Sequence, residues 1–239
     1  MKVLEQLLFE KGKKYQNGLY HLTQILFAYN SNHIEGSRLS QEQTRYIYET
    51  NTVLAEQNGM IPVDDIMETK NHFALFDFML ESVQEPLSES LIKKFHKILK
   101  SGTTDAATSW FKVGEYKAIA NVIGTTETAA PEDVPQKMQQ LLTAYHTSKP
   151  TFEDIVDFHY QFEQIHPFQD GNGRVGRIIM FKECLANEIT PFIVLDEEKM
   201  YYYQGLKKYK SERGYLIETC RHFQDVYQNL IKKYSFPHN

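Results

Sequence analysis

Hydrophobic residues recur three and four positions apart along most of this chain, which is the spacing of one buried face of an α-helix. Residues 19–29 show the pattern clearly. Ser40 and Ser88 stand before such runs with an acid or Gln in the first turn, and Thr151 can form a capping box with Asp154. The pattern predicts helices at 3–10, 14–35, 40–57, 63–83, 88–100, 132–147, 151–165, 173–187, 198–212 and 214–233.

One segment, residues 111–130, departs from the helical pattern. It is rich in Gly, Thr and Ala and contains a short Ile-Ala-Asn-Val-Ile run, so it predicts a β-hairpin rather than a helix. A lone hairpin is not stable in water, so this one must lie against the helices. It is either a surface excursion or a lid or docking ribbon, since long loops in compact domains are often functional. The predicted fold class is therefore all-α, a helical bundle with one short β-hairpin.

Composition places the chain among ordinary globular proteins, with 41% hydrophobic and 24% charged residues. The net charge of −5 gives no basic field that would attract nucleic acid. No apolar run approaches the roughly 20 residues of a membrane-spanning helix, and we do not expect the N-terminal stretch, which has acids within it, to be a secretory signal. Cys184 and Cys220 have no metal-ligand spacing and are expected to be buried thiols in a reducing compartment. We therefore expect a cytoplasmic protein with neither nucleic acid nor membrane as a partner.

The most informative segment is residues 166–177, HPFQDGNGRVGR. Eight of its twelve positions match the pattern HxFxDGNGRxxR, which chance would produce on the order of once in ten billion start positions. Gly171, Asn172 and Gly173 lie between two helical patterns, so free backbone N–H groups and the positive end of a helix dipole meet there. This turn is expected to bind an anion, because glycines let a phosphate approach the backbone closely.

Charged residues around this turn supply the other groups that a polyphosphate site needs. Arg174 and Arg177 are three residues apart, so both guanidinium groups leave one face of the first helical turn and suit phosphate oxygens. Asp170 can hold Mg2+ together with phosphate oxygens. His166 is a candidate general base at neutral pH. Each of these residue types alone more often has a structural role, and Phe168 is assigned to packing. The combination of the base, the carboxylate, the glycine turn and the two arginines indicates nucleotide chemistry.

The complete 166–177 run resembles the signature of the Fic family, whose best-known members transfer AMP from ATP to protein hydroxyl groups. The resemblance implies that His166 deprotonates a Tyr, Thr or Ser hydroxyl, whose oxygen attacks the α-phosphate while pyrophosphate leaves. It implies that Asp170 holds Mg2+, with Mn2+ as a substitute, between the α- and β-phosphates. Gly171, Asn172 and Gly173 would form the anion hole, Arg174 would bind near the β-phosphate and Arg177 would reach the γ-phosphate.

A second resemblance to the same family covers residues 29–40, which are similar to its N-terminal inhibitory helix. The [ST]xxxE[GN] motif of that helix matches Ser31, Glu35 and Gly36. The resemblance implies that Glu35 pairs with Arg177 and so takes the place of the γ-phosphate. The alternative is that Gly36 simply closes a helix and Glu35 is a solvated acid. However, a carboxylate at a helix C-terminus is mildly disfavoured and favours a nearby cation.

The resemblance extends over most of the chain and implies a Fic-type helical bundle. Residues 1–60 would form N-terminal helices that include the inhibitory one, and residues 61–239 would form the catalytic core with a flap at about 111–130. Tyr202 and Tyr203 match aromatic residues that line the family's adenine pocket, although core packing is the alternative. Some relatives carry Asn seven residues after the second Tyr, where this chain has Lys210, so base selectivity stays open.

The function that we expect is protein adenylyltransferase, with a protein substrate that docks on the flap and with self-modification. Three alternatives stay open. The same site could remove AMP through a water held by Glu35, it could use another nucleotide donor, or the chain could be a catalytically silent nucleotide-binding regulator. The sequence leaves open the target protein, the modified residue type and homo-oligomer formation.

Overall fold

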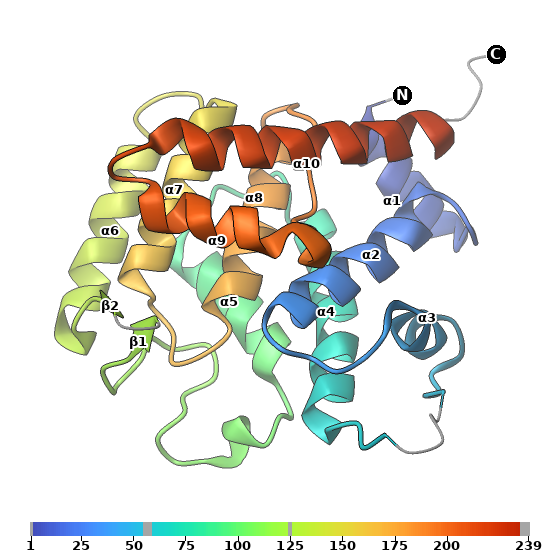
Figure 1. The fold of residues 1–239 in the computed structure, drawn as a ribbon, viewed down its shortest axis with the longest axis horizontal. Helices are drawn as coiled ribbons and strands as arrows, with labels where there is room; N and C mark the ends of the chain where they lie inside the picture. Colours follow the sequence, from blue (N-terminus) through green and yellow to red (C-terminus); the bar gives the residue numbers. More distant parts are fainter. Residues whose placement is uncertain (1, 55–58, 124–125, 235–239) are drawn as a thin grey trace.

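The computed structural model describes residues 2–54, 59–123 and 126–234, and the regular secondary structure within them is almost entirely helical (Figure 1). The α-helices are α1 (Val3–Lys13), α2 (Leu19–Ile34), α3 (Gln41–Thr50), α4 (Val63–Glu81), α5 (Glu89–Lys100), α6 (Val134–Tyr145), α7 (Phe152–Ile165), α8 (Asn172–Ala186), α9 (Lys199–Lys208) and α10 (Arg213–Tyr234). Short 3-10 turns lie at Asp105–Ala107, Pro131–Asp133 and Asp196–Glu198. The predicted all-α fold class is confirmed.

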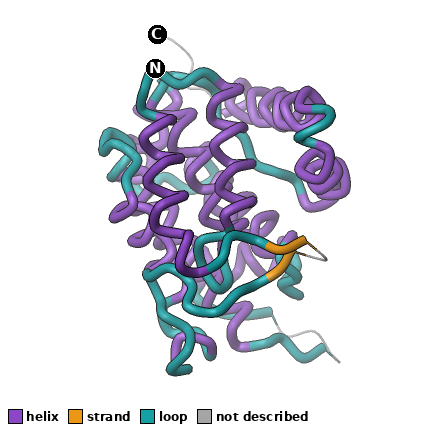
Figure 2. The backbone as a smooth tube through the Cα atoms, turned by 90° about the vertical axis from the view of Figure 1, so that its left-hand side faces the viewer, coloured by secondary structure: helices purple, strands orange, loops and turns teal. Residues whose placement is uncertain are grey.

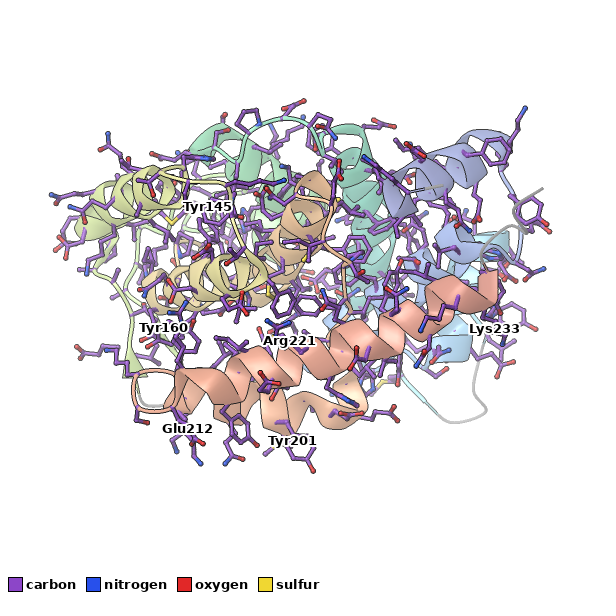
Figure 3. All side chains as sticks on the ribbon, turned by 90° about the horizontal axis from the view of Figure 1, so that it is seen from above. Tyr145, Tyr160, Tyr201, Glu212, Arg221 and Lys233 are labelled. Atoms are coloured by element: carbon purple, nitrogen blue, oxygen red, sulfur yellow. The ribbon has the colours of Figure 1, made fainter. Side chains whose placement is uncertain are left out.

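Helix α8 lies at the centre of the bundle. Nearly all of its residues from Asn172 to Leu185 are buried, and it contacts α2, α4, α5 and α7. A helix that is buried on all sides needs apolar residues on every face, and the stretch from Ile178 to Phe181 provides them. The long helix α10 runs beside α9 along one side of the bundle, as Figures 1 and 3 show. The first residues of α8 are therefore presented by a rigid, buried element.

Three predicted helix boundaries were wrong by four residues or more. The helix expected at 14–35 begins only at Leu19, because Lys14 and Asn17 adopt positive φ and break the chain between α1 and α2. The helix expected at 40–57 ends at Thr50, where Asn51 takes a left-handed C-cap conformation. Residues 55–57 of that prediction lie outside the described part of the chain. The helix expected at 198–212 ends at Lys208, whose carbonyl closes the turn by accepting from the N–H groups of residues 211 and 212.

The β-structure found between residues 111 and 130 is smaller than the segment that predicted it. Strands β1 (Val122–Ile123) and β2 (Thr126–Glu127) pair antiparallel, and Figure 2 shows them as a short projection beside the helices. Residues 124–125, which join them, are outside the described residues. Strands of two residues cannot stabilise one another alone, so contacts to the rest of the protein must hold the hairpin in place.

One hydrophobic core extends from α1 to α10 and includes Leu7, Leu19, Phe76, Val175 and Phe223. Helix α3 is attached through a smaller cluster in which Ile47 and Leu39 pack against Ala28 and Phe73. Helices α1 and α2 therefore share their core with the rest of the protein, and the division at residue 60 stays a prediction. Both cysteines are free and buried, as predicted. None of the described helices is long and apolar enough to cross a membrane.

Candidate active site

The loop between α7 and α8 carries the 166–177 motif and is held rigid by buried contacts. The Asn172 side chain clamps Phe168 by accepting from its N–H at 2.8 Å and donating to its carbonyl at 2.8 Å. The Phe168 ring is fully buried, as predicted, and stacks on His96 with ring centroids 4.0 Å apart. His96 Nδ1 accepts from Gly114 N–H, so Nε2 carries the proton and donates to the Asp170 carbonyl at 3.1 Å. These contacts fix the loop before any ligand binds.

His166 ends α7 as its C-cap, with a left-handed φ of 51°. The side chain is 19% exposed, and its Nδ1 lies 3.7 Å from a carboxyl oxygen of Glu163. Burial, and after it the nearby ammonium group of Lys117, lowers the pKa of His166 to about 4. The imidazole is therefore neutral at physiological pH and can accept a proton.

The N-terminus of α8 presents backbone N–H groups with no partner inside the helix. Gly171 is the N-cap with φ of 81°, and the first intrahelical N–H bond runs from Val175 to the Gly171 carbonyl at 3.0 Å. The N–H groups of residues 172–174 therefore lack an intrahelical acceptor, and they lie at the positive end of the helix dipole. Because the Asn172 side chain is committed to Phe168, this residue can meet an anion only through its backbone.

Arg174 is buried in an ion network that the sequence did not indicate. Its Nη1 bonds to Glu68 of α4 and to Asn32 Oδ1 at 3.3 Å, and its Nη2 lies 3.1 Å from Asp170 Oδ2. Lys100 of α5 joins Glu68 at 2.5 Å and Asp170 at 2.6 Å. Although burial opposes the charge, Glu68 raises the pKa of Arg174 above its ordinary value. The sequence contains one weak indication of this network: Lys100 lies four residues after His96, so both are on the buried face of α5.

Asp170 is the candidate metal ligand, and its carboxylate is held ionised. Burial would raise its pKa, but the positive charges of Arg174 and Lys100 bring the pKa well below the usual value. The side chain is 46% exposed, and both cations bind its Oδ2. Among the described residues no cluster of three or more His, Cys, Asp or Glu could hold a metal unaided. One ionised, half-exposed carboxylate fits Mg2+ that takes most of its ligands from phosphate and water.

Arg177 is brought together with both residues of the predicted inhibitory motif. Its Nη2 bonds to Glu35 Oε1 at 2.7 Å and to the Ser31 carbonyl at 2.9 Å, while its Nε donates to Ser31 Oγ at 3.0 Å. The Arg177 side chain is 2% exposed and that of Glu35 is 34% exposed. Although burial opposes the charge, Glu35 raises the pKa of Arg177. Gly173 makes room for this pair, since a Cβ there would collide with Glu35 Oε1.

Glu163 is a further buried acid that the sequence did not indicate. It precedes His166 by one helical turn, and among the residues that the structure describes its Oε1 has no hydrogen-bond partner. Burial, with a smaller contribution from Glu35, raises the pKa of Glu163 to about 8. The carboxyl is therefore mainly protonated at neutral pH. Its only sequence signal is its position on the apolar face of α7.

The three consecutive tyrosines of α9 lie in different environments. Tyr201 points away from the protein (Figure 3) and is 56% exposed. Tyr202 is buried, and its hydroxyl is 2.5 Å from His159 Nε2. Tyr203 is partly exposed and donates to the Ile34 carbonyl at 3.0 Å, which places it beside the end of α2. Contact of Tyr202 and Tyr203 with adenine stays a prediction.

Comparison with known proteins relates this chain to one family. A model of the Fic/DOC family matches residues 86–184, which include the whole loop between α7 and α8. Over 189 residues the chain is 23% identical to protein adenylyltransferase Fic of Nematostella vectensis, covering 75% of this chain and 42% of that protein. Over 193 residues it is 25% identical to protein adenylyltransferase fic-1 of Caenorhabditis elegans, covering 77% and 36%. The chain thus spans less than half the length of these curated relatives.

Solved structures show the same fold. A Fic domain containing signaling protein from Bacteroides thetaiotaomicron superposes with a TM-score of 0.72 at 24% identity, covering 97% of this chain and 94% of that one. Fic-1 of Caenorhabditis elegans superposes with a TM-score of 0.73 at 21% identity, covering 96% and 71%. The helical bundle described above is therefore shared with these proteins across almost the whole chain.

Proposed function

We propose that this chain, whose residues 86–184 match a model of the Fic/DOC family, transfers AMP from ATP to a hydroxyl side chain of a protein, itself included, with release of pyrophosphate. One observation carries the proposal: a neutral, partly buried His166 stands one short loop before the α8 N-terminus, where Arg174 and Arg177 lie. The chain thus provides a proton acceptor and a polyphosphate cradle within twelve residues. The names of its curated relatives agree with this activity.

In the proposed mechanism, the neutral imidazole of His166 takes the proton from the target hydroxyl. The hydroxyl oxygen forms a bond to the α-phosphorus, the bond from that phosphorus to the bridging oxygen breaks, and pyrophosphate leaves. The α8 N-terminus and the guanidinium groups of Arg174 and Arg177 neutralise the phosphate charge, which is the main protein contribution in such transfers. Mg2+ held by Asp170 would supply further charge neutralisation at the phosphates.

The same site contains its own inhibitor in this proposal. The Glu35 carboxylate occupies the guanidinium face of Arg177 that a γ-phosphate would take. Since both groups are anionic and bind the same cation, they exclude one another. ATP would then bind weakly or in an unproductive position until α2 withdraws Glu35.

The hairpin β1–β2 is the proposed docking place for the target. An edge strand can accept an extended peptide by strand addition, which sets the register of that peptide through backbone hydrogen bonds. The base of the hairpin lies next to the loop that carries His166, since Asn121 donates to the Phe168 carbonyl at 3.0 Å. A docked segment would therefore bring its hydroxyl toward the imidazole.

Labelled ATP tests this proposal. Protein with Glu35→Gly is incubated with Mg2+ and ATP that carries the label on the α- or the γ-phosphate, and the labelled protein is counted. AMP transfer predicts protein-bound label from α-labelled ATP alone. Label from γ-labelled ATP alone would show phosphate transfer instead. If neither ATP labels the protein, the proposed reaction and donor are wrong.

A further inference from the structure

Lys117 lies between the hairpin and the loop that carries His166, and it is 96% buried, since 4% of its surface is exposed. Its ammonium group donates to Asn121 Oδ1 at 2.7 Å, to Thr128 Oγ1 at 2.6 Å and to the Ile165 carbonyl at 3.4 Å. All three acceptors are neutral. Within residues 2–54, 59–123 and 126–234, Lys117 forms no ion pair with a carboxylate. A buried ammonium without a counter-ion is unusual and needs a physical reason.

Two of these acceptors stand at the base of the hairpin. Asn121 directly precedes β1 and Thr128 directly follows β2, so Lys117 holds both arms at the open end. Thr128 Oγ1 also lies 2.6 Å from Asn121 Oδ1 and 2.9 Å from the Asn121 carbonyl. Because the two-residue strands cannot hold one another, this cluster of Lys117, Asn121 and Thr128 is what gives the hairpin a fixed position.

The same cluster is bonded to the loop between α7 and α8. The Lys117 N–H donates to the Pro167 carbonyl at 2.8 Å, and Asn121 Nδ2 donates to the Phe168 carbonyl at 3.0 Å. Together with the Lys117 contact to Ile165, these bonds meet the backbone on both sides of His166. Any movement of the hairpin base relative to His166 would break several of them.

The charge of Lys117 also acts on His166. The charged or titratable groups that face the imidazole are Glu163, Lys117, Glu35 and Asp170, and after burial Lys117 contributes most to keeping its pKa low. Burial lowers the pKa of Lys117 itself to about 8, so the ammonium is still mainly charged at neutral pH.

We propose that Lys117 is a positioning residue for the transfer reaction, which fixes the target-docking hairpin to the His166 loop and keeps the imidazole in its base form. The inference rests on the proposed function of the site. The proposal explains why Lys117 has no carboxylate partner among the described residues, because a carboxylate beside Lys117 would cancel the electric field of its ammonium group at His166. It also predicts two separable effects, one from the hydrogen bonds and one from the charge.

Two variants in the Glu35→Gly background separate these effects. Lys117→Met keeps much of the side-chain bulk and removes both the bonds and the charge, whereas Thr128→Val is nearly isosteric and removes bonds alone. Amide hydrogen exchange of residues 117–123 and 126–128 should become faster in both variants. The pKa of His166, followed by NMR of the imidazole, should rise by about one pH unit or more in Lys117→Met, the size typical of a nearby charge, and stay unchanged in Thr128→Val.

The transfer reaction gives an independent readout with α-labelled ATP. The acid limb of the labelling rate should move to higher pH in Lys117→Met, while Thr128→Val should lower the rate equally at all pH values. The KM for ATP should change in neither variant, since the cluster contacts neither Arg174 nor Arg177. Unchanged hydrogen exchange and an unchanged His166 pKa in a folded Lys117→Met protein would overturn the proposal.

Failure of the proposed function is distinguishable from failure of this inference. If Glu35→Gly alone takes up no label, the transfer reaction is wrong. The hydrogen-exchange and NMR measurements do not need turnover, so they still decide whether Lys117 couples the hairpin to His166. If Lys117→Met fails to fold, as judged by circular dichroism, the Thr128→Val variant alone tests whether the cluster holds the hairpin in place. Hydrogen exchange in Thr128→Val as slow as in the Glu35→Gly parent would then overturn the proposal.

Discussion

Replacing Glu35 by Gly should release Arg177 for phosphate binding without disturbing the fold. Glu35 is the C-cap of α2, so a Gly there lies outside the helix interior, where Gly is costly. Arg177 would keep its bonds to Ser31 Oγ at 3.0 Å and to the Ser31 carbonyl at 2.9 Å, so its guanidinium group should stay in place. Only the carboxylate at 2.7 Å leaves. The substitution therefore removes a competitor for the γ-phosphate and little else.

The size of the effect follows from the bond that is removed. A hydrogen bond between charged groups contributes about 1.5–3 kcal/mol, which corresponds to about a 10- to 150-fold change in an equilibrium constant. ATP no longer has to displace this bond in the variant. We expect its dissociation constant to fall by about this factor, and AMP transfer to rise at least as much where the bound pose also becomes productive.

Isothermal titration calorimetry with ATP and Mg2+ measures the affinity, in a His166→Ala background that prevents turnover. Labelling with α-labelled ATP measures transfer in the otherwise unmodified protein. Glu81→Gly is a matched control, because Glu81 also ends a helix and pairs with a cation, Lys11, but is 62% exposed and distant from the site. Glu35→Gln tests charge against size and should give an intermediate gain. Unchanged ATP affinity in folded Glu35→Gly protein would refute the reasoning.

Three further predictions concern the α7–α8 pair. Removing the base with His166→Ala should lower labelling by about 10²–10⁴-fold and leave ATP affinity, measured by calorimetry, nearly unchanged. A Cβ at Gly176 would lie 2.6 Å from His159 Nδ1, so Gly176→Ala should destabilise the protein by about 1–3 kcal/mol in urea unfolding; an unchanged midpoint would contradict this close packing. Burial raises the pKa of Glu163 from 4.5 to about 8, so the folded state favours the protonated carboxyl and the stability of the protein should fall as pH rises from about 4.5 to 8. Glu163→Gln cannot ionise and should flatten this part of a plot of urea midpoint against pH. An equally steep plot for Glu163→Gln would show that Glu163 is not the cause.

The sequence predicted the helical class and the local features of the site for identifiable reasons. Periodicity and capping residues such as Thr151 are local signals, and the structure has the Thr151–Asp154 capping box as expected. The Gly-Asn-Gly turn between two helical patterns is also a local signal, so the free N–H groups at the start of α8 could be predicted from the sequence. The pairing of Glu35 with Arg177 spans 142 positions. It could be foreseen only because both residues belong to motifs of a known family.

Contacts that join distant segments without a motif could not be predicted. Glu68 meets Arg174 across 106 positions, and Lys117 meets Ile165 across 48. In the sequence, Glu68 and Lys117 each resemble an ordinary exposed charge. Only the packing of the bundle shows that Lys117 is buried and Glu68 largely covered. The misplaced start of α2 has a local cause instead, since the positive φ values of Lys14 and Asn17 override a continuous helical pattern.

The central claim is that one site, composed of His166 and the α8 N-terminus, transfers AMP under the control of Glu35. Intact-protein mass spectrometry tests it most directly, after incubation of the wild-type protein, Glu35→Gly and Glu35→Gly/His166→Ala with ATP and Mg2+. We predict addition of one or more adenylate groups that is strongest in Glu35→Gly and at least about 100-fold weaker in the double variant. A phosphate adduct, or an adenylate adduct of similar amount without His166, would contradict the claim.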